Sequence, residues 1–159
     1  MAHATQPHTA APTAHAPAHA VGHGQPHPVG HALLDALHAE LAHLLAAATR
    51  ADDGQLAPAL AAVQAHLQHH LRQEDQWMET TAFPPRECHR NEHAAVLASV
   101  AEVRAALAGG NVATARRLLH ELQAWQPAHT QYLDSALAAW LCGRQHGGKP
   151  VVLHARPPH

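Results

Sequence analysis

From residue 31 onward, apolar side chains recur at steps of three and four residues, which is the spacing of one face of an α-helix. The pattern predicts helices over about 31–50, from Leu56 to about residue 80, over 86–108 and over 112–142. Phe83-Pro84-Pro85, Gly109-Gly110 and Gly143 are expected to end helices, and Pro58 to lie in a first turn. No segment has the alternation of a strand. The sequence therefore predicts an all-α fold, an up-down-up-down four-helix bundle.

Composition changes sharply at both ends of this periodic region. Residues 1–30 consist mainly of Ala, His, Pro and Gly, which predicts a disordered low-complexity tail. Its histidines suit weak binding of an extra transition metal such as Ni, Cu or Zn, and a plain solvated linker is the alternative. Residues 31–142 form the predicted helical domain, and residues 143–159 a second flexible tail.

Charge and hydropathy exclude several classes of function. The chain contains 10 Lys and Arg and 12 Asp and Glu residues. The resulting net charge of −2 argues against nucleic-acid binding. No apolar run is long enough to span a membrane. The first 30 residues contain no Lys, Arg, Asp or Glu, so a secretory or transit signal is not expected. We therefore expect a cytoplasmic protein. Cys88 and Cys142 are interpreted as isolated thiols.

Histidine is abundant, at 19 residues, so a histidine spacing alone carries little information. More specific are the pairs four residues apart, His70 with Glu74 and His89 with His93, because such pairs share one face of a helix. The first and fourth predicted helices add further inward candidates, namely His38, His129 and Asp134. Nitrogen and oxygen ligands without thiolate suit iron, manganese or zinc, and two carboxylates suit a pair of metal ions.

The order and spacing of these residues resemble the hemerythrins, particularly the bacterial single-domain ones. The resemblance rests on Asp35-x-x-His38, His70-Leu71-x-x-Glu74-Asp75-x-x-Met78, Phe83-Pro84, His89-x-x-x-His93 and Trp125-x-x-x-His129-x-x-x-x-Asp134. It covers residues 31–142, and the acidic, aromatic and proline positions of the pattern do not depend on the histidine content.

The resemblance implies a non-haem di-iron centre with an oxo or hydroxo bridge. It implies that one iron is bound by His89, His93 and His129, the other by His38 and His70, and that Glu74 and Asp134 bridge the two. The second iron would keep an open position for reversible O2 binding, so an oxygen carrier, store or supplier is expected rather than an enzyme. Two alternatives stay open: a cytoplasmic O2 or redox sensor, and a di-iron protein that removes peroxide or nitric oxide.

One spacing conflicts with a regular helix. Five residues separate His129 from Asp134, which puts them about 140° apart on an ideal α-helix. We therefore predict a wider, π-type turn between them. Pro127 removes a backbone donor close by and favours a distortion in the same place.

The resemblance also implies an O2 pocket lined by Leu71, Trp125, Gln126 and Thr130. Leu71, Gln126 and Thr130 depart from the residues that are usual in the family, whereas Trp125 does not. The polar pair, Gln126 and Thr130, predicts faster oxidation of the O2-bound protein, because water and protons reach a polar pocket more easily. In the alternative, Gln126 points away into solvent or a neighbouring helix. His43 and His69 are expected to be surface residues. His66, one turn before His70, is expected to be a partly exposed bystander, and the alternative is that it supports the ligand His70.

Overall fold

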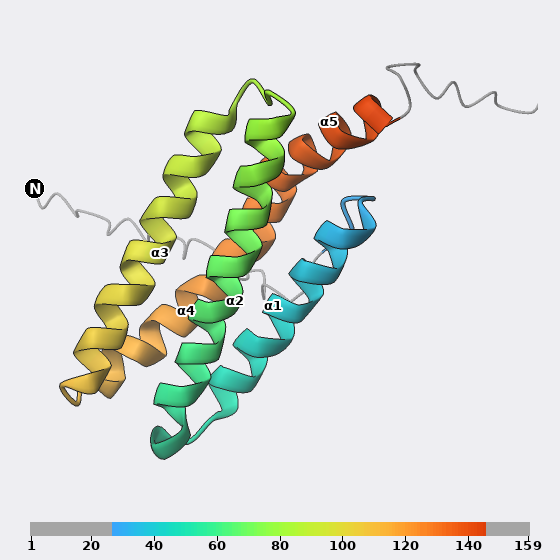
Figure 1. The fold of residues 1–159 in the computed structure, drawn as a ribbon. Helices are drawn as coiled ribbons and strands as arrows, with labels where there is room; N and C mark the ends of the chain where they lie inside the picture. The colour runs from blue at the N-terminus through green and yellow to red at the C-terminus, as the bar shows by residue number, and fades with distance from the viewer. Residues whose placement is uncertain (1–26, 146–159) are drawn as a thin grey trace, which may run out of the picture.

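Helix α1 (Ala32–Arg50) is followed by α2 (Asp53–Thr80), α3 (Arg86–Ala108) and α4 (Val112–His129) in an antiparallel arrangement in the computed structural model, which describes residues 27–145 (Figure 1). A π-helical turn, η1 (Thr130–Asp134), joins α4 to α5 (Ser135–Gln145), so these three elements act as one long fourth helix. Helix α1 packs against α2, α2 against α3, and α3 against α4. The contact between α4 and α1 closes the bundle. The predicted all-α four-helix bundle is confirmed.

Side-chain caps and turns fix the helix ends. Asp52 accepts a hydrogen bond from the backbone of Gln55 at the start of α2, and Asn111 accepts one from Thr114 at the start of α4. These caps satisfy backbone donors that a first helical turn leaves unpaired. Gly110 has a φ of +92° in the turn between α3 and α4, where glycine avoids the strain that a side chain would cause.

Two apolar clusters fill the bundle and leave a polar layer between them. The larger cluster lies toward the α1–α2 and α3–α4 turns and includes Leu56, Leu67 and Leu119. The smaller one lies toward the α2–α3 turn and is formed around Met78 and Leu137. Along α2 the polar residues at positions 70 and 74 therefore sit between apolar ones, which separates them from water at both ends.

The predicted π-type turn is confirmed. The backbone N–H of Ser135 bonds the carbonyl of Thr130, five residues earlier, at the end of η1. A helix with this bonding turns less per residue, so the fifth residue returns to nearly the same face. Pro127 lies in the last turn of α4, directly before the distortion. Asp134 is consequently on the same buried side as His129.

Some helix limits differ from the expected ones. Helix α2 begins at Asp53 because Asp52 caps it, so Pro58 lies in the second turn and not in the first. Gly143 does not end the last helix, which continues to Gln145. The expected N-terminal tail falls outside the described residues except for 27–30, which are not helical, and most of the expected C-terminal tail also falls outside them. Within the described part, no helix is both long and apolar enough to cross a membrane.

Candidate metal centre

The predicted ligand side chains meet in the polar layer at the centre of the bundle. Helices α1 to α4 and the π-helical turn all contribute: His38 from α1, His70 and Glu74 from α2, His89 and His93 from α3, His129 from α4 and Asp134 from η1. All of them are at most 4% exposed. Residues four apart on α2 and on α3 share an inward face, as the sequence spacing predicts.

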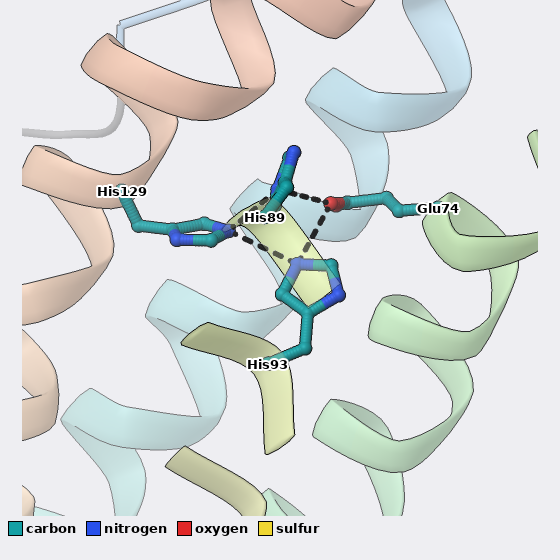
Figure 2. Close-up of side chains that lie close together, drawn as sticks. All are labelled: Glu74, His89, His93 and His129. Atoms are coloured by element: carbon teal, nitrogen blue, oxygen red, sulfur yellow. Dashed lines mark hydrogen bonds and ion pairs between the residues drawn. The ribbon is translucent and has the colours of Figure 1, made fainter. Parts of the chain in front are cut away.

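Four of these side chains point toward a common centre (Figure 2). The Nε2 atom of His129 lies 3.2 Å from Nε2 of His89 and 3.3 Å from Nε2 of His93. Oε2 of Glu74 lies 3.4 Å from Nε2 of each of His89 and His93. Metal bonds of about 2.1 Å at right angles would separate neighbouring ligand atoms by about 3.0 Å, so these four atoms lie close enough together to bind one metal ion.

A second group consists of His38, His70 and Glu74, and the two carboxylates reach both groups. The Oε1 atom of Glu74 lies 2.6 Å from Nε2 of His70, while its Oε2 faces the histidines of α3. Oδ2 of Asp134 lies 2.9 Å from Nε2 of His38, while its Oδ1 lies 3.1 Å from Nε2 of His89 and of His129. Each carboxylate therefore has one oxygen for each group of histidines.

The buried polar atoms of this cluster are not satisfied by the protein alone. Within the described part of the chain, both oxygens of Glu74, Oδ1 of Asp134 and Nε2 of His70 are buried without a hydrogen bond of good geometry. Buried carboxylates are costly unless they are paired or coordinate a metal. The oxygen and nitrogen donors, their convergence and their missing partners all fit bound metal ions.

The cluster is also strongly coupled electrostatically. Burial alone would raise the pKa of Glu74, but the imidazoles of His70, His89 and His93 outweigh it and hold that pKa well below its ordinary value. Asp134 behaves in the same way: burial would raise its pKa, but the surrounding imidazoles outweigh burial and lower it. Burial would lower the pKa of His89, yet Asp134 and Glu74 raise it to about 9. The carboxylates thus stay charged and attract cations.

Two acidic residues outside the cluster contact its histidines, and sequence reasoning assigned them no role. Nδ1 of His93 lies 2.9 Å from Oδ1 of Asp75, and Nδ1 of His129 lies 3.0 Å from Oε1 of Glu92. Trp125 donates a hydrogen bond to the same oxygen of Glu92, at 2.9 Å. Asp75 is part of the motif that carries the resemblance, and Glu92 directly precedes a predicted ligand, but neither position by itself indicates a contact with an imidazole nitrogen.

The expected pocket residues surround the cluster unequally. Leu71 is part of the larger apolar cluster, and the ring of Trp125 lies 4.5 Å from that of His129. Gln126 is buried and donates a hydrogen bond of 2.6 Å to the backbone carbonyl of His38 on α1, so it points to a neighbouring helix and not to solvent. The hydroxyl of Thr130 is buried and lacks a hydrogen-bond partner among the described residues.

The remaining histidines correct one expectation. His43 and His69 are exposed, as predicted. The prediction of a partly exposed bystander is wrong for His66, which is buried; its Nε2 lies 3.1 Å from the carbonyl of Leu37. The ring of His66 also lies 5.5 Å from that of His70. Its burial follows from its place at the α1–α2 contact, which depends on how the two helices are rotated.

Comparison with known proteins agrees with this geometry. The family profile described as Hemerythrin HHE cation binding domain matches residues 29–141. The chain is 42% identical over 113 residues to Bacteriohemerythrin of Ralstonia nicotianae, an alignment that covers 71% of this chain and 82% of that relative. No solved structure matches. The matched region contains every side chain of the cluster.

Proposed function

Because this chain belongs to the hemerythrin family, we propose that its central cluster holds two iron ions and binds O2 reversibly. The chain would then serve as an oxygen carrier, store or local supplier and not primarily as an enzyme. His89, His93 and His129 would hold one ion, His38 and His70 the other, and Glu74 and Asp134 would bridge them. An iron pair with one open coordination position supplies the electrons and the binding site that O2 requires.

One observation carries the proposal: each buried carboxylate faces both groups of histidines. A site for a single ion needs one group of ligands around one centre. Here Glu74 and Asp134 each direct one oxygen to His38 or His70 and the other to the three-histidine group. Three imidazoles would bind one ion, but only His38 and His70 would bind the other. The ion at His38 and His70 would therefore have one ligand fewer, which favours an open coordination position there.

The protein surroundings suit reversible binding. Apolar clusters lie on both sides of the polar layer, and the ligand side chains are almost fully buried. Restricted access of water and protons slows loss of bound oxygen in a reduced form. The residues of the bundle therefore orient the metal ligands and exclude solvent, and no separate acid or base is needed.

The proposal is tested with anaerobically reduced, iron-loaded protein. Its visible spectrum is recorded before and after air is admitted and again after O2 is removed, and iron per chain is measured on the same sample. We expect two irons per chain and a band that appears with O2 and disappears on deoxygenation. Immediate irreversible oxidation without such a band would contradict reversible binding.

Adjacent histidines on α2 provide matched variants for this experiment. His70 is buried in the cluster, whereas His69, at the preceding position of the same helix, is exposed. We expect His70→Ala to lose about half of the bound iron and the reversible band. The His69→Ala protein should retain both, and equal losses in the two variants would argue against the assigned ligands.

Removal of peroxide or nitric oxide is a second candidate function. The observation that favours it is the buried, unpartnered hydroxyl of Thr130, directly after His129 in the described region, because a polar group there can assist proton delivery. Repeated turnover of added peroxide or nitric oxide by the purified protein would support this candidate. A single stoichiometric reaction would support the carrier.

A further inference from the structure

The two ends of the cluster differ in how their histidines are held. A neutral imidazole that binds a metal through Nε2 carries its remaining proton on Nδ1. The partner of that N–H fixes both the tautomer and the direction of the ring, and its removal commonly weakens metal binding. The surroundings of each Nδ1 therefore indicate which imidazoles are ready to bind.

At the three-histidine end, two of the three rings have such partners, and only Nδ1 of His89 is buried without one among the described residues. Nδ1 of His93 lies 2.9 Å from Asp75, and Nδ1 of His129 lies 3.0 Å from Glu92. Each carboxylate is placed to accept a hydrogen bond from Nδ1–H, which directs Nε2 of the same ring into the cluster. Glu92 is itself held by the indole N–H of Trp125. Two of the three rings at this end are therefore oriented by neighbouring carboxylates of the protein itself.

At the other end, neither ring has a partner of this kind. Nδ1 of His38 and of His70 is buried and has no hydrogen bond within the described chain. Nε2 of His38 lies 2.9 Å from Oδ2 of Asp134, on the side of the ring that faces the cluster. A metal bound through Nε2 leaves the remaining proton on Nδ1, where no acceptor is present among the described residues, and a buried unpaired N–H is unfavourable.

We propose that Asp75 and Glu92 are positioning residues that cause the three-histidine end to take up a metal ion first. The end formed by His38 and His70 fills second and with lower affinity. This ordered filling rests on the proposed function, since it requires that the cluster hold two ions. It predicts a distinct one-metal form of the protein.

The exposure of the two positioning residues makes them suitable for substitution. Their side chains are 34% and 40% exposed for Asp75 and Glu92 respectively, and both lie within helices, where alanine is well tolerated. Asp75→Ala and Glu92→Ala remove the acceptor, while Asp75→Asn and Glu92→Gln keep an acceptor oxygen without its charge. Glu121→Gln, at an exposed acid of α4, is the matched control for the loss of charge.

The experiment is a titration of the full-length, metal-free protein with Co²⁺ under anaerobic conditions, followed by proton NMR. Slowly exchanging, strongly shifted resonances report Nδ1–H groups of bound histidines, and exposed histidines exchange too fast to contribute. We expect the resonances of His93 and His129 to be complete at one Co²⁺ per chain. A second set is expected only as the second ion binds.

The variants are expected to act on the first binding constant. Each alanine substitution should weaken it about 10- to 100-fold, the usual effect of removing such a partner, and Asn or Gln should restore part of the loss. The second constant should change much less, and Glu121→Gln should change neither. Metal-free variants should unfold within a few degrees of the parent, which excludes partial unfolding as the cause.

The outcomes separate this inference from the function on which it rests. Fewer than two ions in the cluster would contradict the di-iron proposal itself. Two ions of equal affinity, or a first ion bound by His38 and His70, would overturn ordered filling alone. Equal effects of the alanine variants and of Glu121→Gln would show that general charge, and not the Nδ1 contact, controls the first binding step.

Discussion

Deletion of Tyr132 is expected to leave the metal centre functional, because η1 contains one residue more than an α-helical turn requires. Tyr132 is 72% exposed, so its removal costs little packing. An α-helix rotates by about 100° per residue and a π-helical turn by roughly 80°. Five residues of η1 and four of an α-helix therefore both cover about 400°, and Asp134 keeps its direction relative to His129.

The energetic effect of this deletion is small and favourable. The bond from the Ser135 N–H to the Thr130 carbonyl would become an ordinary bond between residues four apart. Regular bonding restores at most about one backbone hydrogen bond, worth about 1 kcal/mol. The metal-free deletion protein is thus expected to unfold at the same temperature as the parent or up to a few degrees higher.

A deletion in the regular part of α4 provides the control. Ala124 is exposed, and its removal rotates every later residue by about 100° relative to the first part of the helix. His129 and Asp134 would then leave the bundle interior. Metal per chain is measured after loading and gel filtration, and thermal unfolding is followed by circular dichroism. We expect two ions per chain for the Tyr132 deletion and a large loss for the Ala124 deletion.

Equal loss of metal in the two deletion proteins would refute this reasoning. Such a result would mean that the π-helical bonding itself, and not only the direction of Asp134, is needed to bind metal. Retention of metal by the Ala124 deletion would be equally damaging, because it would show that the fourth helix can shift register without cost.

Three further predictions concern the core, the metal and the pocket. Leu67→Ala, at a fully buried position of the larger cluster, should destabilise the metal-free protein by about 2–5 kcal/mol in denaturant unfolding, and less than 1 kcal/mol would contradict the packing described. Removal of metal by a chelator should lower the unfolding temperature, with a stabilisation of about 2.7 kcal/mol when free metal is 100 times its Kd; an unfolding temperature independent of metal would exclude binding to the folded state. Thr130→Val should slow oxidation of the O2-bound protein more than Gln126→Leu does, because the amide of Gln126 already donates to the His38 carbonyl; the reverse order, read from the decay of the visible band, would show that Gln126 controls the pocket.

Much of the fold follows from local signals in the sequence. The limits of α3 agree with prediction because prolines precede it and glycines follow it. The π-helical turn was predictable because two inward residues were spaced too widely for one face of an α-helix. The start of α2 was missed because Asp52 caps the helix before the apolar pattern begins. Gly143 shows the opposite error, since a single glycine is tolerated within a helix at modest cost.

The contacts around the cluster were not predictable in the same way. His66 and Gln126 are buried because of how α1 is rotated against α2 and α4, and that rotation is set by packing across helices. The sequence contains no local signal for it. A polar residue one position from an inward stripe can equally face solvent or a neighbouring helix.

Glu74 and Asp75 show how sharply adjacent acids can differ in role. One helical step of about 100° directs Glu74 into the cluster, where it is fully buried, and directs Asp75 to the Nδ1 side of His93 on α3. The first carboxylate faces the metal side of an imidazole and the second faces its other nitrogen. His93 therefore lies between two consecutive residues of α2, so its ring is fixed from both sides by a single helix. No corresponding pair flanks His38 or His70 in the described structure, and this difference is the physical reason to expect the two metal positions to behave unequally.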